Sequence, residues 1–372
     1  MQYLAAFAYI ARAAGRFCRF YQNALASFAA FTKPAPTPAM PTPSPADLGA
    51  TVQQRLFERI KAATLPYQSV VDEVADALGL SPDSVYRRMR GEKALTLDEA
   101  LRLCRRYRLS LDGLDSAATG TVAFQYSRLQ SADDFEQYLE GMAHFLGLMQ
   151  AAEQRQMLYG AADVAIFHSF GHPEYRAFKL FYWQQSVLRL PELQGVRFSP
   201  ERVSARALAL AEKIYQRYYA VPSVEIWTVY SALTACRQLG YYYEAGLFES
   251  PALARTVVGQ LRAALAGVVA MAEKDSKDEA GRIPFQLYES EIQIGNNTVL
   301  AQAGPMRITY VSHQTFNVMT TQNPDFCDDT EAFLRGLIRR STLISGVSER
   351  QRAQFFAKIV EPVEGLLARI QG

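Results

Sequence analysis

The basic residues between positions 87 and 93 are the side chains whose type and spacing most clearly suggest a chemistry. A planar guanidinium can bind a guanine edge through two hydrogen bonds or clamp a phosphate, and nearby serine hydroxyls can donate to phosphate. This composition indicates recognition of a nucleic acid. The segment SPDSVYRRMRGEK contains four cations and two acids: Arg87, Arg88, Arg90, Lys93, Asp83 and Glu92.

Two short helices joined by a tight turn would position these residues. Ser69 followed by Asp72 forms a capping box, and the apolar residues after it repeat at helical spacing. Gly79 can adopt the left-handed conformation that ends a helix and turns the chain. Ser81 as the N-cap and Pro82 at the first helical position then begin the second helix.

The second helix is predicted to bury one face and expose the other. Val85 and Met89, four residues apart, form the expected buried seam, with Arg88 near its boundary. We expect the outward residues and the adjoining turn to contact DNA, in the major groove and at phosphates. These residues are Ser81, Pro82, Asp83, Ser84, Tyr86, Arg87, Arg88, Arg90 and Lys93.

Flanking segments extend this pair of helices to a bundle over residues 51–115. Capping boxes at Thr51 and Thr96 begin an upstream and a downstream helix, and residues 109–114 add a last half turn. The expected result is a compact domain of five helices.

This bundle resembles the helix-turn-helix of the Cro and lambda-repressor type (XRE-like) found in bacterial transcription regulators. The resemblance covers less than a fifth of the chain and implies double-stranded DNA as the partner. One position departs from the family, because Arg88 stands where an apolar residue is common. The matching residues are Ala75, Leu78, Gly79, Leu80, Ser81, Val85, Gly91 and the run LTLDEALRLCRRYRLSLDGL.

The charge balance limits what kind of DNA binding is expected. The whole chain has a net charge of only +2, so a non-specific coat for nucleic acid is excluded. With few phosphate contacts per copy, affinity would have to come from a homodimer on two half-sites about one helical turn apart.

Length and composition indicate a cytoplasmic protein of two or three domains. The chain has 372 residues, of which 49% are hydrophobic. We expect no membrane partner, since the most apolar stretch, residues 257–272, contains Gln260 and Arg262. The four cysteines are scattered without metal-ligand or disulfide spacing, which favours a reducing compartment.

Residues 1–47 differ from the rest of the chain. An alanine- and aromatic-rich stretch is followed by KPAPTPAMPTPSP, whose prolines forbid helix and sheet. We expect a disordered extension, or a segment upstream of the functional start. The alternative is a segment that docks on a membrane or a partner.

The fold is expected to be mainly α, with a small antiparallel sheet near the C terminus (α+β). Residues 122–275 are predicted to form helices at about 131–157, 174–190, 200–219, 223–245 and 251–274. Residues 282–372 are predicted to form strands, with a reversal at Gly295 to Asn297, and then helices at about 327–344 and 348–370. These two parts make one domain or two.

Catalytic chemistry is not expected. His168 and His172 lie four residues apart with Glu174 nearby, but Gly171 and Pro173 disturb the helix that a shared metal would need. Glu289 and Glu291 on a presumed strand could form a carboxylate pair, although an exposed strand edge explains them more simply. The chain also lacks phosphate-binding and nucleophile-elbow motifs. We therefore predict no catalytic residue, metal or cofactor.

Tyrosine-rich segments at 166–183 and 214–244 suit either a pocket for an amphipathic effector or packing between helices. Core packing is the more economical interpretation for any single ring. Tyr241, Tyr242 and Tyr243 cannot all be buried on one helix face, so at least one should face solvent, a pocket or a partner.

Together these patterns favour a sequence-specific transcription regulator in which residues 122–372 sense an effector, either a small molecule or a protein, or form the dimer. One alternative is an interaction scaffold whose helical head docks on protein instead of DNA. A third is an enzyme with an appended regulatory head.

Overall fold

The structure is a computed structural model that describes residues 51–64, 68–107, 109, 111, 121–314 and 316–371. The expected extension and linker at residues 1–47 lie outside the described residues. Most of the expected last half turn at 109–114, and with it the fifth helix of the bundle, also lies outside them.

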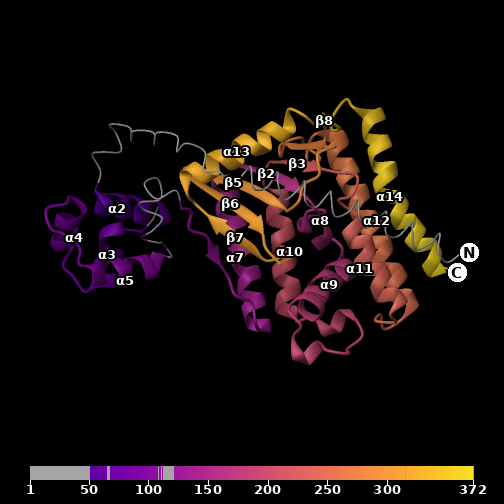
Figure 1. Cartoon of the computed structure of the whole chain (residues 1–372), viewed down its shortest axis with the longest axis horizontal. Helices are drawn as coiled ribbons and strands as arrows, with labels where there is room; N and C mark the ends of the chain where they lie inside the picture. The colour runs from indigo at the N-terminus through magenta and orange to yellow at the C-terminus, as the bar shows by residue number, and fades with distance from the viewer. Residues whose placement is uncertain are drawn as a thin grey trace, which may run out of the picture. The chain divides into compact units, whose positions relative to one another are not determined.

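The described part of the bundle consists of helices with a small core of their own (Figure 1). Leu56, Val74, Val85 and Leu103 are among the side chains buried in that core. Side-chain caps begin the helices as expected; the hydroxyl of Ser69, for example, accepts from the N–H of Asp72. The helices are α2 (Val52–Ala63), α3 (Val70–Leu78), α4 (Pro82–Met89) and α5 (Leu97–Tyr107).

Within the described residues from 121 onward, the strands form an eight-stranded mixed sheet in the order β1-β7-β6-β5-β2-β3-β4-β8. β3 runs parallel to both β2 and β4, whereas the other pairs are antiparallel. The strands are β1 (Gln125–Tyr126), β2 (Arg155–Ala161), β3 (Ser223–Trp227), β4 (Phe285–Glu289), β5 (Thr298–Ala303), β6 (Met306–Ser312), β7 (Val318–Thr321) and β8 (Thr342–Leu343).

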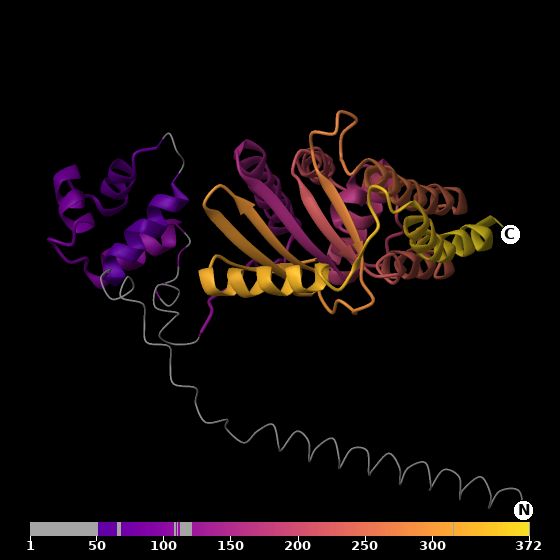
Figure 2. The same cartoon turned by 90° about the horizontal axis from the view of Figure 1, so that it is seen from above.

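Helices cover both faces of this sheet (Figure 2). Helix α13 (Pro324–Ile338) packs on one face, over Leu158, Ile226 and Leu300 of the central strands. The neighbouring residues Tyr159 and Trp227 point to the opposite face and enter the larger core. That core is formed with α7 (Ala132–Ala151), α8 (Ile166–Phe170), α9 (Pro173–Tyr182), the π-helix Trp183–Val187, α10 (Ala205–Tyr219), α11 (Leu233–Glu244), α12 (Pro251–Lys274) and α14 (Glu349–Gln371).

The expected fold class, mainly α with a small antiparallel sheet near the C terminus, is wrong. The sheet is mixed, and three of its strands, β1, β2 and β3, come from the region expected to be helical. β2 begins where the helix from Ser131 was expected to continue to Met157, and β3 occupies the start of the expected helix at 223–245. Strands buried on both faces are short apolar runs without alternation, so periodicity does not distinguish them from buried helix.

The reversal expected at Gly295 to Asn297 does not make a hairpin either. β4 pairs with β3 and β8, whereas β5 pairs with β2 and β6, so the two strands lie on opposite sides of the β2–β3 pair. The later strands β5, β6 and β7 do form an antiparallel run, as expected. The helix predicted at 251–274 is α12, and α14 continues as helix through Pro362.

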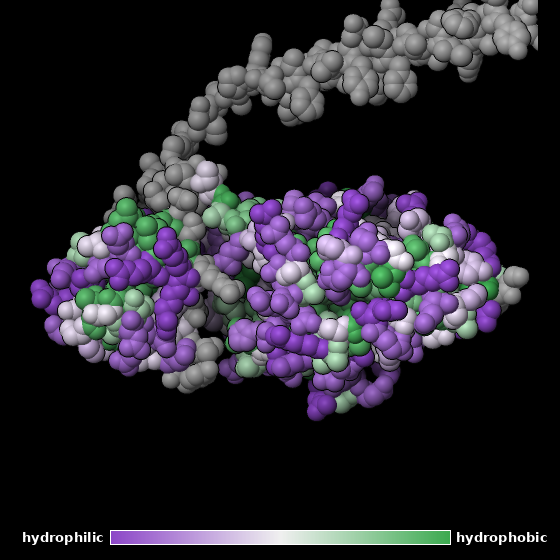
Figure 3. Space-filling view, turned by 90° about the horizontal axis from the view of Figure 1, so that it is seen from below, coloured by the Kyte–Doolittle hydropathy of each residue, from purple (hydrophilic) through white to green (hydrophobic). Residues whose placement is uncertain are grey.

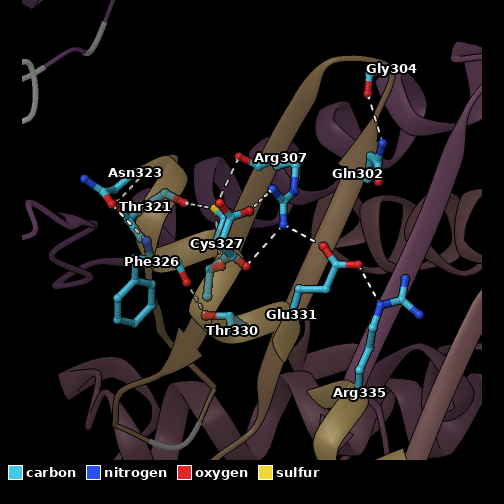
Figure 4. Close-up of polar contacts among 12 residues, drawn as sticks. Gln302, Gly304, Arg307, Thr321, Asn323, Phe326, Cys327, Thr330, Glu331 and Arg335 are labelled. Carbon is cyan, nitrogen blue, oxygen red and sulfur yellow. Dashed lines mark hydrogen bonds and ion pairs between the residues drawn. The ribbon is translucent and has the colours of Figure 1, made fainter. Parts of the chain in front are cut away.

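Arg307 on β6 fixes α13 against the sheet (Figure 4). Its guanidinium donates to Glu331 Oε2 at 2.7 Å and to the Cys327 carbonyl at 3.3 Å, and it pairs with Asp328. Glu331 in turn accepts from Arg335, one turn further along α13. This network orients the helix that closes one face of the sheet.

Among the described helices, α12 is long and apolar enough to cross a membrane by length and composition. Its buried residues, including Val257, Leu261, Leu265 and Val268, belong instead to the large core. This burial is typical of a core helix. The face of the molecule that Figure 3 shows is largely hydrophilic, with hydrophobic residues in small groups.

Candidate nucleic-acid interface

The turn between α3 and α4 has the geometry expected of a helix-turn-helix. Gly79 is left-handed, with φ +67° and ψ +40°, and the next N–H, that of Leu80, donates to the Ala75 carbonyl at 3.0 Å. Ser81 is extended, and its hydroxyl accepts from the N–H of Ser84. Val85 is fully buried and seats α4 on the bundle core.

The opposite face of α4 is exposed and combines an aromatic ring with two cations. Tyr86 is 49% exposed, and the side chains of Arg87 and Arg90 are 53% and 55% exposed. The structure therefore places these three where a large ligand can reach them. Of the other expected contact residues, Ser84 is half-buried, and the exposed ones are Ser81, Pro82, Asp83 and Lys93.

Arg88 lies on the buried side of α4 and not on the exposed face. Only 3% of the residue is exposed, and its guanidinium donates to Glu99 Oε1 at 2.8 Å and to Glu99 Oε2 at 3.3 Å. It also donates to the Ser84 carbonyl. Arg88 thus fills the position that is commonly apolar in helix-turn-helix proteins of the Cro and lambda-repressor type, and it pairs there with a carboxylate from α5. Met89, which was expected in the buried seam, is only half-buried.

Glu99 is a shared acceptor for two elements of the bundle. It accepts from Arg88 on α4 and, through Oε2, from the N–H of Thr96 at 2.9 Å, which caps α5. Burial raises the pKa of Glu99, but the hydrogen bonds from Thr96 and Arg88 outweigh that effect and lower it overall. This carboxylate therefore holds α4 and α5 in a fixed relation.

Glu92 connects the two exposed arginines. Its carboxylate accepts from Arg90 Nε at 2.6 Å and from Arg90 Nη2 at 3.1 Å, and it lies 3.7 Å from Arg87 Nε. The hydrogen bond from Arg90 lowers the pKa of Glu92 below its ordinary value, because it stabilises the charged carboxylate. The cations that we expect to contact DNA are thus already grouped around an anion.

The structure does not bring the histidine constellation together as a metal site. His168 Nε2 lies 3.0 Å from Glu225 Oε1, whereas Glu174 accepts from Gln260. His172 is half-buried, and burial, with His168 nearby, lowers its pKa. Within the described residues there is no group of three acidic, histidine or cysteine side chains placed to hold a metal.

The structure also does not bring Glu289 and Glu291 together as a carboxylate pair. β4 ends at Glu289, so Glu291 lies in the loop beyond it and the two carboxylates share no strand.

The tyrosines of the aromatic segments differ in burial. Tyr242 is buried and donates to Gln185 Oε1 at 2.7 Å, whereas Tyr241 is 60% exposed. Tyr241 lines an open groove of about 560 Å³ between α11 and α14. Most rings of the aromatic segments pack in the core, among them Phe167, Phe170, Phe178, Phe181, Trp183 and Tyr218.

A buried polar cluster around Glu225 has no counterpart in the sequence interpretation. Glu225, at the centre of β3, is 0% exposed and accepts from Tyr218, from Trp227 Nε1 at 2.7 Å and from a ring nitrogen of His168. Lys277 Nζ lies 3.3 Å from the centre of the Tyr218 ring and donates to two backbone carbonyls. Burial lowers the pKa of Lys277. The one feature of the sequence that could have indicated this cluster is the glutamate inside the apolar run SVEIW.

The exposed face of α4 is consequently the best-defined candidate site, because its cations are accessible and its buried side is fixed by Val85 and Arg88. The cluster around Glu225 is enclosed by the core and lies beneath the helices that cover the sheet. Comparisons of the chain with protein-family models, curated proteins and solved structures give no match.

Proposed function

We propose that this protein is a sequence-specific DNA-binding transcription regulator whose bundle is a helix-turn-helix of the Cro and lambda-repressor (XRE-like) type. The observation behind the proposal is the two-sided character of α4. Val85 and Arg88 fix its inner side, while Tyr86, Arg87 and Arg90 project from its outer side. A helix with these properties fits the major groove, which is about 12 Å wide.

The order of residues along α4 supports this assignment. The first residues of a recognition helix are those that contact base edges, and here they are Pro82, Asp83 and Ser84, preceded by the N-cap Ser81. Hydroxyl groups at this end can donate to bases or phosphates. The cations Arg87, Arg90 and Lys93 come later and supply attraction to the DNA backbone.

We further propose a homodimer in the cytoplasm, in which residues 122–372 form the dimer or bind an effector. Few cations are available on α4 and the net charge is +2, so a second copy would double the phosphate contacts. The open groove beside Tyr241 is a place where a small effector could bind. The proposal assigns no catalysis to the chain.

The test is a pull-down of fragmented genomic DNA with the purified full chain. We expect a small set of enriched sequences, which should be lost in the variant Arg87→Ala plus Arg90→Ala. Because these arginines supply attraction to the DNA backbone, their removal should weaken binding to all sequences and reduce the slope of log affinity against log salt by about 1 per arginine. A matched control, Arg102→Ala plus Arg105→Ala, removes the same charge from exposed positions of α5.

Two results would contradict the proposal. One is the absence of any enriched sequence with the unmodified protein, which would favour a scaffold whose bundle docks on protein. The other is equal loss of enrichment in the α4 and α5 variants, which would mean that general charge, and not the exposed face of α4, binds DNA.

A further inference from the structure

Arg87, Arg90 and Glu92 form a compact group at the C-terminal end of α4. The two oxygens of Glu92 meet the two nitrogens of Arg90 side by side, at 2.6 and 3.1 Å, and the Arg87 Nε lies 3.7 Å from the same carboxylate. Two guanidinium groups thus converge on one small anion. Each of the three side chains is about half exposed, so a larger ligand can reach the group.

The backbone holds Glu92 in this position. Gly91 has a φ of +79°, a left-handed conformation that turns the chain sharply after α4. The N–H groups of Glu92 and Lys93 then donate to the Arg87 carbonyl, at 2.9 and 3.3 Å. The end of the helix therefore places the Glu92 backbone beside Arg87 and Arg90, where the carboxylate can reach both guanidinium groups.

We propose that Arg87 and Arg90 together bind one DNA backbone phosphate, and that the Glu92 carboxylate occupies this phosphate site in the free protein. This inference rests on the proposed DNA-binding function. Carboxylates and phosphates accept from a guanidinium with the same paired hydrogen-bond geometry. Because an exposed ion pair is weak, a phosphate on a highly charged duplex can replace Glu92 at little cost.

The two ends of α4 would then have different roles in DNA binding. A phosphate contact fixes the register of the protein on the duplex but does not discriminate between sequences. Arg87 and Arg90 would then contribute equally to binding of the target and of unrelated DNA. Discrimination between sequences would fall to the N-terminal half of α4, where Ser81, Asp83 and Ser84 lie.

The test compares two duplexes, the best one selected by the unmodified full chain from a random library and the same duplex with its sequence shuffled. We expect Glu92→Gln to bind both duplexes about two- to fivefold more tightly, since the phosphate no longer competes with an internal carboxylate. Arg90→Ala should weaken both to a similar extent and reduce the slope of log affinity against log salt by about 1.

The matched control is Asp76→Asn, which removes one negative charge from an exposed position on α3. It should change affinity less than twofold, and Glu92→Gln should give no gain in an Arg87→Ala plus Arg90→Ala background. An equal gain from Asp76→Asn and Glu92→Gln would overturn the inference, as would a loss in Arg90→Ala confined to the selected duplex. If the unmodified protein binds no duplex at all, the proposed function itself fails.

Discussion

The helical bundle and the region from residue 121 onward each hold a carboxylate with little or no exposure among hydrogen-bonding partners, but the partners come from very different distances along the chain. In the bundle, Arg88 and Glu99 are 11 residues apart. In the larger region, Glu225 meets His168 across 57 residues, and Lys277 lies over the ring of Tyr218, whose hydroxyl donates to Glu225. The first contact orients an exposed helix, whereas the second lies inside the core. The first carboxylate thus lies beneath an exposed surface, whereas the second is part of the core.

The largest expected effect is that of Glu225→Gln. Removing the charge leaves the donors from His168, Tyr218 and Trp227 without their charged partner, so the region should lose about 3–5 kcal/mol of unfolding free energy. Both tryptophans of the chain, Trp183 and Trp227, are buried in this region. Denaturant unfolding followed by tryptophan fluorescence therefore measures the stability of the larger region selectively.

Glu291→Gln is the control for that experiment, because Glu291 is exposed in the loop after β4. It should change the unfolding free energy by less than about 0.5 kcal/mol. Equal stability of the two variants would show that the cluster around Glu225 contributes nothing to the larger region. The buried carboxylate of the larger region would then have no stabilising role to compare with that of the Arg88–Glu99 pair.

Arg88→Met should have the next largest effect, and it should be confined to the bundle. It leaves Glu99 partly buried without its cation, which we expect to cost the bundle about 2–3 kcal/mol. Adding Glu99→Gln should recover part of this loss. Hydrogen exchange of α4 and α5 amides measures the effect, and the tryptophan transition should not move. A shift of that transition would show that the two regions unfold as one unit.

The control Arg102→Met removes an exposed arginine from α5. Its effect on amide exchange should be small, since a surface charge away from partners contributes little. If Arg88→Met and Arg102→Met behave alike, Arg88 does not hold α4 in place.

Local features of the bundle could be predicted from the sequence, whereas contacts between distant segments could not. Caps at Ser69 and Ser81 and the left-handed Gly79 act within a few residues, so the α3–turn–α4 geometry could be predicted from local chemistry. The partner of Arg88 could not, because it depends on how α4 and α5 pack. β2 and β3 cannot be predicted in this way, because their burial depends on strands and helices far along the chain.

A smaller effect is expected from acid at Asp278, in the loop before β4. Burial alone would raise its pKa, but hydrogen bonds from Arg282, Ser276 and Ile283 lower it to about 2. Because the folded pKa lies below the ordinary value, the stabilisation is complete above pH 4 and is lost as the pH falls through about 2. Asp278→Asn should reduce the steepness of acid unfolding in that window, followed by tryptophan fluorescence. An unchanged acid profile would show that this loop does not contribute.

The most direct test of the central claim is the salt dependence of duplex affinity for the full chain and its Arg87→Ala plus Arg90→Ala variant. We predict that the unmodified protein binds a selected duplex with an affinity that falls steeply between 50 and 200 mM salt, about as expected for several phosphate contacts. The variant should bind much more weakly and with a smaller slope. No duplex affinity at low salt, or identical slopes for the two proteins, would contradict the assignment of α4 as the DNA-binding helix.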